Sequence, residues 1–290
     1  MRTLRENPLL RYHLLGATRY RWRRQPWLYG AAVLGIGLVY LLVLQLTVFN
    51  EAGMITTLGL ALFVMCIAAP LMAYNLFSLE YEKQTWESLA LTRLTAREIF
   101  WGKYGAALAR VALTTLLFAP FLLTTYRATT YVIVAAFIVL FSWGALLVSV
   151  GLWLSFKLKR TLTTAATLYA GQVFVLMLFP FLYALFSGGE MGPGQSAIEW
   201  VQNYRDGFLA WVISLLNGSL IIYANPFYAS AQLEYMAAVP AWWWNAEGWD
   251  AYANALRYML WGFAQSAMYL GLAALFAGFA YRGVKISWRK

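Results

Sequence analysis

The sequence predicts an all-α integral membrane protein with six transmembrane helices and both chain ends on the same side of the bilayer. Of its 290 residues, 62% are hydrophobic and only 12% are charged, whereas soluble globular proteins carry about 25% charged residues. The apolar residues form long runs, and the basic residues gather between those runs. A soluble core of this size cannot bury so much apolar surface, so lipid must cover part of it.

Six apolar runs reach the length of about 20 helical residues that a bilayer requires. They are Trp27–Val48, Met54–Leu79, Tyr104–Tyr126, Tyr131–Phe156, Thr161–Ser187 and Leu256–Tyr281. The first run is too long for the apolar core of a signal peptide, so we expect it to be retained as a span. Residues 1–290 then form one transmembrane domain, which a basic amphipathic segment, residues 1–26, precedes.

The positions of lysine and arginine orient these spans. With the N terminus inside, only Arg127, Arg205 and Arg257 of the 22 basic residues fall on the outer side, together with more than half of the 12 acidic residues. The opposite orientation would place nearly all basic residues on the wrong side. We therefore expect both termini inside, and the net charge of +10 reflects membrane sidedness and not a nucleic-acid partner.

The region between the fifth and sixth spans, residues 188–255, is expected on the outer side. Its run Phe208–Tyr223 is apolar but short, contains Asn217-Gly218-Ser219, and is followed by Asn225-Pro226, which stops a helix. One extra crossing would carry the basic C terminus to the outer side. We interpret residues 208–224 as either a re-entrant pair or an outer surface helix.

The spans lack the side chains that several kinds of membrane machine require. No Asp, Glu, Lys, Arg or His lies in the middle of a span, which disfavours a proton-coupled pump, because a proton relay needs titratable groups at depth. One histidine and one cysteine are too few for the usual zinc sites, and no phosphate-binding Gly-x-x-x-x-Gly-Lys-Ser/Thr sequence is present. We expect no enzyme activity, metal or cofactor in this chain, so any ATP must be bound by another chain.

The polar side chains at depth are neutral amides. They are Gln45, Asn75, Gln172 and Gln265. Such amides bond between helices or line a substrate path.

Small residues recur on one face of the last span. They are Ala267, Gly271, Ala274 and Gly278. Another helix of this chain, or of a second copy, can approach closely at that face.

The inner loop between the second and third spans, residues 80–103, is the most informative segment. It reads EYEKQTWESLALTRLTAREIFWGK. Thr85 is a good N-cap for a short helix, Trp86–Leu91, with Glu87 in its first turn. Trp86, Leu89 and Leu91 give this helix an apolar side rimmed by charge. The side either docks on a partner or rests on the membrane surface or neighbouring helices.

A second helix is expected to follow in the same loop. Thr95 and Glu98 have the Thr-x-x-Glu spacing of a capping box, which begins a helix. We expect this helix to run through Lys103 into the third span, after a tight turn at Arg93-Leu94.

This loop resembles the cytoplasmic loop of type-2 ATP-binding-cassette (ABC) transporter permeases. The matching residues are Glu80, Glu82, Thr85, Glu87, Leu89, Leu91, Thr92, Leu94, Ile99, Gly102 and Lys103. The chain departs from the family pattern at Gln84, where glycine is usual, and at Arg93, where proline is usual. Asn7-Pro8 before the first span and Asn225-Pro226 before the last are similar to Asn-Pro pairs of the family.

The resemblance implies a permease subunit of an ATP-driven exporter in the bacterial cytoplasmic (inner) membrane. This chain would pair with a second copy or a paralogue and with two soluble ABC ATPase subunits, which bind ATP and Mg. The short loop helix would be the coupling helix that contacts the ATPase. The residues implied for that contact are Glu82, Thr85, Trp86, Glu87, Leu89 and Thr92.

The resemblance also implies a substrate path along the second and fifth spans. Its candidate residues are Asn75, Gln172, Phe174 and Met177. Lys103 and the N-terminal arginines are assigned to the inner headgroup boundary. The residues alone leave two other functions open, a non-transporting membrane assembly or scaffold protein and a secondary transporter, and they name no substrate.

Overall fold

The computed structural model describes residues 27, 30–31, 34–35, 37–38, 40–42, 45, 53–91, 94–124, 130–178, 225–227 and 249–287. The N-terminal segment 1–26, the Thr92-Arg93 pair and the run Phe208–Tyr223 lie outside these ranges, as does most of the region 188–255. The predictions made for those segments are therefore predictions still.

Every regular element in the described ranges is a helix, as the sequence predicts. The elements are α4 (Gly53–Ala73), α5 (Ser78–Glu82), α6 (Trp86–Ala90), α7 (Ala96–Leu117), α8 (Ala119–Thr124), α9 (Thr130–Leu158), α10 (Thr161–Val173), the π-helix η3 (Phe174–Leu178) and α16 (Trp249–Ser287).

Five helical segments in the described ranges are long and apolar enough to cross a membrane. They are Thr57–Glu82, Ala96–Leu123, Ile133–Leu158, Thr161–Leu178 and Gly262–Ser287, and they overlap the second to sixth predicted runs. The described residues between Trp27 and Gln45, in the first predicted run, are also helical. Among them, Tyr40 packs its ring 4.2 Å from that of Phe121.

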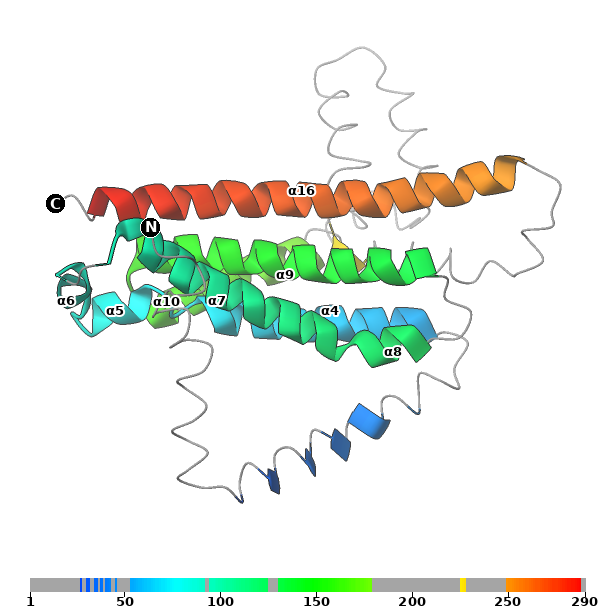
Figure 1. Cartoon of the computed structure of the whole chain (residues 1–290), viewed down its shortest axis with the longest axis horizontal. Coiled ribbons are helices and arrows are strands. Elements are labelled where there is room, and N and C mark those ends of the chain that lie inside the picture. The colour runs from blue at the N-terminus through cyan, green and yellow to red at the C-terminus, as the bar shows by residue number, and fades with distance from the viewer. Residues whose placement is uncertain are drawn as a thin grey trace, which may run out of the picture.

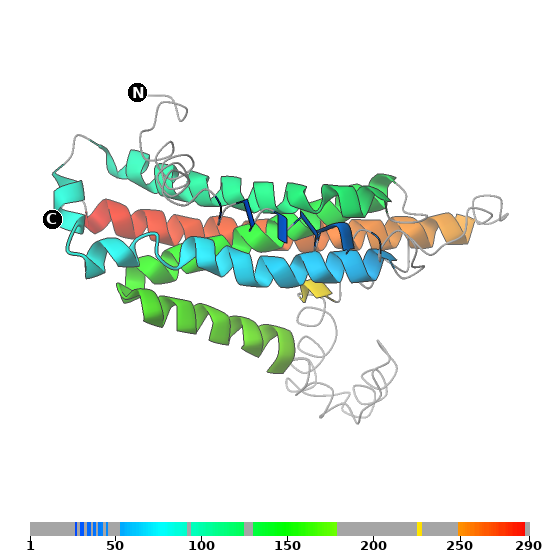
Figure 2. The same cartoon turned by 90° about the horizontal axis from the view of Figure 1, so that it is seen from below.

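Helix α9 lies at the centre of the bundle. The long helices lie side by side along one axis (Figures 1 and 2), and α9 contacts α4, α7, α10 and α16. The close approach of α9 to α4 and α7 depends on Gly144. A Cβ atom at Gly144 would lie 2.6 Å from Val111 Cγ1 and 2.7 Å from Met65 Sδ. The bare backbone of α9 at this point lets α4 and α7 pack against it at once.

One end of the bundle collects α6, the turn between α9 and α10, and the C-terminal end of α16 (Figure 1). Basic residues mark this end. They are Lys83, Arg97, Lys157, Lys159, Arg160, Arg282 and Lys285. We call it the basic end. It unites segments that lie far apart in the sequence and that the lysine and arginine pattern assigns to one side of the membrane.

The small-residue face of α16 does not pack inside the described bundle. Ala267, Gly271, Ala274 and Gly278 are all exposed, and a Cβ at either glycine would meet nothing within 4 Å. The expectation that another helix covers this face is therefore not met by the described residues. The reason is that α16 packs through a different face. The buried residues of that face are Tyr269, Ala273, Ala277, Ala280 and Val284.

Replacing Gly144 with alanine should destabilise the bundle. The added methyl overlaps Val111 and Met65, and overpacking of this kind costs about 2 kcal/mol. Gly271→Ala is the matched control, because its methyl enters open space and alanine favours a helix by up to about 1 kcal/mol. Thermal unfolding in detergent should move in opposite directions for the two variants. Equal shifts would contradict this packing.

Candidate functional site

Within the 80–103 loop, a sharp turn at Gln84 leads from α5 into the short helix α6. Thr85 occupies the N-cap of α6, as predicted, but its side chain makes no capping bond. Its hydroxyl donates instead to the Glu80 carboxylate, while the hydroxyl of Ser88 donates to the Thr85 carbonyl at 2.8 Å. The predicted capping bond is therefore wrong, because the backbone of Thr85 is helical, with φ of −90° and ψ of −2°, and not in the extended conformation from which an N-cap side chain reaches the first-turn amides.

Gln84 connects α5 to α6 in a left-handed conformation, with φ of 55°. The Gln84 amide donates to the Tyr81 carbonyl at 3.2 Å, and the Thr85 amide donates to the Glu80 carbonyl at 2.9 Å. These bonds fold the chain back sharply. A non-glycine residue pays about 1–2 kcal/mol for this conformation. The site is therefore one where glycine is the favoured residue.

Four aromatic rings hold α6 against the bundle, and we call them the aromatic cluster. They are Phe77, Tyr81, Trp86 and Phe156. The Trp86 ring stacks on Tyr81 at 5.0 Å with an interplanar angle of 24°, and lies 5.9 Å from Phe77 and 6.3 Å from Phe156. Its Nε1 donates to Ser287 Oγ at 3.2 Å. One indole thus contacts α5, α9 and the end of α16.

A buried lysine lies directly beneath this cluster. The side chain of Lys103 is only 1% exposed, so the prediction that it meets lipid headgroups is wrong. Its Nζ donates to the Leu76 carbonyl and to Glu80 Oε1 at 3.1 Å, and lies 4.9 Å from the centre of the Phe77 ring. The chain turns away from helix after Ala73, which leaves carbonyls near the turn for an outside donor.

The Glu82 carboxylate caps the start of α10, 79 residues away in the sequence. Its carboxylate accepts from the Thr161 amide at 2.7 Å and from the Thr161 hydroxyl at 2.8 Å. Two residues before Thr161, Lys159 is left-handed with φ of 56° and places its Nζ 4.9 Å from the Tyr81 ring centre. The start of α10 is therefore tied to α5.

The predicted capping box at the start of α7 is confirmed. The Glu98 amide donates to Thr95 Oγ1 at 3.2 Å, and the Thr95 amide donates to Glu98 Oε2 at 2.8 Å. Because both residues are local to the turn, their spacing alone identifies the helix start. The helix then continues through Lys103, as predicted.

The side chains predicted to contact an ATPase face in different directions, some toward the bundle and some outward. Trp86 is buried and Leu89 is half-buried against the core. Glu82 and Thr85 are exposed but hold contacts within the chain. Glu87 points outward, and with it Leu91, which is 88% exposed. Thr92 lies outside the described residues.

Three of the predicted substrate-path residues lie close together in the chain, and Asn75 lies apart from them. Asn75 lies in the turn between α4 and α5, at the basic end. Gln172, Phe174 and Met177 lie on α10 and η3, beginning about 17 Å along α10 from Thr161. Phe174 and Met177 are exposed, and Gln172 is buried with its Nε2 making no hydrogen bond within the described ranges.

Gln265 makes the inter-element bonds expected of an amide at depth. Its Nε2 donates to the Asn225 carbonyl at 3.3 Å and to the Tyr269 hydroxyl at 2.8 Å. Asn225 in turn donates to the Leu176 carbonyl at 3.4 Å and accepts from the Phe227 amide at 3.0 Å. The Asn225-Pro226 pair is therefore fixed between η3 and α16.

The sequence reasoning missed the residues that receive the loop. Phe156, Thr161 and Ser287 lie at span ends far from residues 80–103, and each contacts the loop only in the folded chain. A weak signal existed, because aromatic and hydroxyl residues at several span ends face the same side in the predicted topology.

In comparisons with known proteins, no protein-family model and no curated protein matches the chain.

Replacing Gln84 with glycine should raise the free energy of unfolding by about 1 kcal/mol, because it removes the steric cost of the left-handed backbone. Lys83→Gly is the control. Lys83 has φ of −86°, so glycine at this position relieves no backbone strain. It increases only the conformational entropy of the unfolded chain, so the free energy of unfolding should stay the same or fall. Thermal unfolding of the purified protein measures both. A destabilised Gln84→Gly variant would contradict the assigned backbone.

Replacing Glu82 with alanine should lower the free energy of unfolding by about 1 kcal/mol, the usual effect of losing an N-cap. Hydrogen exchange should increase at the first amides of α10. Glu87→Ala removes an exposed carboxylate from the same loop and should change stability by about 0.5 kcal/mol or less. Unchanged exchange at Thr161 in Glu82→Ala would refute the cap.

Proposed function

We propose that this chain is the permease subunit of an ATP-driven ABC exporter and that α6 is its docking element for a separate ATPase. The observation that supports the proposal is the two-sided character of α6. Its inward side is fixed to the bundle through Trp86, whereas Glu87, Ser88 and Leu91 face outward at the basic end. A surface element that moves rigidly with several spans suits the transfer of force.

The proposal takes the basic end as the cytoplasmic side. Lysine and arginine favour the cytoplasmic side of membrane proteins, and a soluble ATPase would reach α6 only from there. The N-in, C-in topology with six spans, the inner-membrane location and the pairing of two permeases with two ATPases belong to the same proposal.

The path of force follows from the contacts of α6. A push on its outer face reaches α5 through Tyr81, α9 through Phe156 and α16 through Ser287. The Glu82–Thr161 cap extends the same connection to α10. The loop also couples to α7 through the buried Lys103–Glu80 ion pair. Closure of two ATPases on α6 would therefore displace the spans together and not the loop alone.

The left-handed Gln84 supports the resemblance on which the proposal rests. The family usually has glycine at this position, and in this chain the backbone there adopts the conformation that favours glycine. Gln84 thus departs from the family in side chain but not in backbone geometry. The agreement involves a single residue and is independent of the matched side chains.

The outer face of α6 contributes a small contact patch. Leu91 would enter an apolar pocket of the ATPase, and Glu87 would pair with a basic residue at its rim. Trp86 and Leu89 act in this proposal by holding α6 in position, because their side chains are committed to the bundle.

Glu87→Arg and Leu91→Arg should each reduce copurification of an ABC ATPase from native membranes by at least about ten-fold, since each places a charge in a desolvated contact. Thr163→Arg is the control, because Thr163 is exposed on α10 at the same end. Quantitative mass spectrometry of the tagged chain measures the ATPase.

Three outcomes oppose the proposal. An ATPase that copurifies equally with all variants removes the docking role of α6. A copurified partner whose ATP hydrolysis does not depend on this chain indicates an assembly or scaffold protein. Solute-driven current in proteoliposomes without ATP indicates a secondary transporter.

A further inference from the structure

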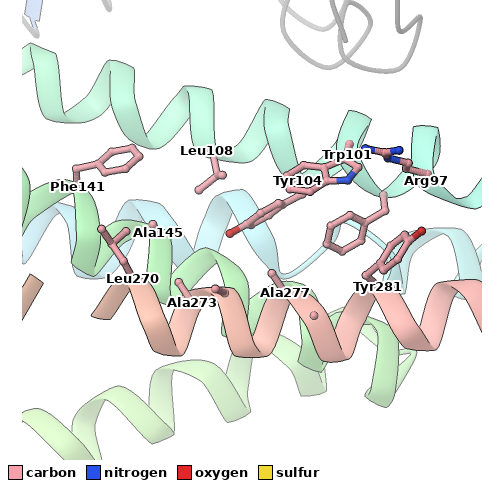
Figure 3. Close-up of a pocket in the computed structure, with 13 residues that line it drawn as sticks. Arg97, Trp101, Tyr104, Leu108, Phe141, Ala145, Leu270, Ala273, Ala277 and Tyr281 are labelled. Carbon is pink, nitrogen blue, oxygen red and sulfur yellow. The ribbon is translucent and has the colours of Figure 1, made fainter. Parts of the chain in front are cut away.

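A groove of about 620 Å³ runs between α7 and α16, with α9 at its base (Figure 3). Arg97 and Tyr281 lie at one end of the groove, and Phe141 and Leu270 lie at the other. Apart from Arg97, the side chains that line it are aromatic or aliphatic. The groove is therefore apolar along its length, with one cationic side chain at its basic end.

The groove exists because α16 presents small residues to it. Ala274, Ala277 and Gly278 line its α16 side, and they do not reach across to the large side chains of α7, such as Trp101. At the basic end the gap narrows, where the rings of Phe100 and Tyr281 meet at 5.3 Å. An apolar groove of this size offers dispersion contacts to an apolar occupant from α7, α9 and α16.

The length of the groove matches one leaflet of a bilayer. From Arg97 to Leu108, the last lining residue of α7, the helix rises about 17 Å. The hydrocarbon core of a membrane is about 30 Å thick, so one leaflet contributes about 15 Å. An acyl chain that starts at the basic end would fill the groove to near the bilayer midplane.

The cation at the mouth suits a lipid phosphate. Arg97 is exposed at the first turn of α7, and no carboxylate of the described residues lies within ion-pair distance of it. Trp101, one turn further along the same side, is 40% exposed, and tryptophan favours the headgroup level. Basic pockets between spans on the cytoplasmic side bind anionic lipid headgroups.

We propose that this groove binds one acyl chain of an anionic phospholipid from the leaflet at the basic end, with the lipid phosphate on the Arg97 guanidinium. The lipid would fill the space between α7 and α16 and so complete the packing of these two helices. The proposal depends on the membrane-spanning architecture and not on an ATPase partner.

Native mass spectrometry of the full chain, released from vesicles of equal phosphatidylglycerol and phosphatidylethanolamine content, tests the site. We expect one tightly held phospholipid, with phosphatidylglycerol preferred. Arg97→Gln should reduce that preference about five-fold, the contribution of one cation near an anionic surface. Gly278→Leu and Ala274→Leu should each abolish binding of phosphatidylglycerol and of phosphatidylethanolamine alike, because the leucine side chain fills the groove.

Arg282→Gln is the matched control, because Arg282 is exposed at the same end but does not line the groove. Its lipid retention should equal that of the unmodified chain. The site is refuted if Arg97→Gln retains the full preference, or if both leucine variants keep the lipid. Disulfide-linked dimers of Gly278→Cys in native membranes would also refute it, because a second copy would then occupy this face.

Discussion

Burial of the Trp86 indole is the contact on which the basic end depends. A helix of five residues is too short to be stable alone in water, so α6 takes its position from what it packs against. The indole meets three other rings and donates to Ser287. Because these partners belong to different helices, one side chain fixes the loop and also brings the ends of those helices into register.

The polar groups around the cluster restrict the loop further. Lys103 and Glu80 form an ion pair beneath α6, and the Glu82 carboxylate holds the start of α10. A buried charge without its partner is costly, so such pairs tolerate few alternative arrangements. The loop is therefore bonded to other helices on its inner side, whereas the bond of the outward-facing Ser88, to the Thr85 carbonyl, stays within the loop. In the proposed function, this asymmetry separates the positioning side of α6 from its docking side.

The sequence predicted what depends on local pattern and missed what depends on contacts between distant residues. Run length found the second to sixth spans, and the Thr95–Glu98 spacing found the start of α7. The capping bond fails at Thr85 because its backbone is helical and not extended, which the residue type does not reveal. The burial of Lys103 depends on Leu76 and Glu80, which lie beside it only once α5 and α7 pack together. The small-residue face of α16 was likewise identified correctly as a stripe, but a stripe does not say which neighbour, if any, covers it.

The length of α16 gives the bundle a mechanical property. Its 39 residues make a rod of about 58 Å, nearly twice the thickness of a hydrocarbon core of about 30 Å. The rod ends at Ser287, which is bonded to Trp86. A tilt of about 5° pivoting at that bond would swing the opposite tip, Trp249, through about 5 Å. A small tilt of α16 at the basic end would therefore become a larger displacement at its other end.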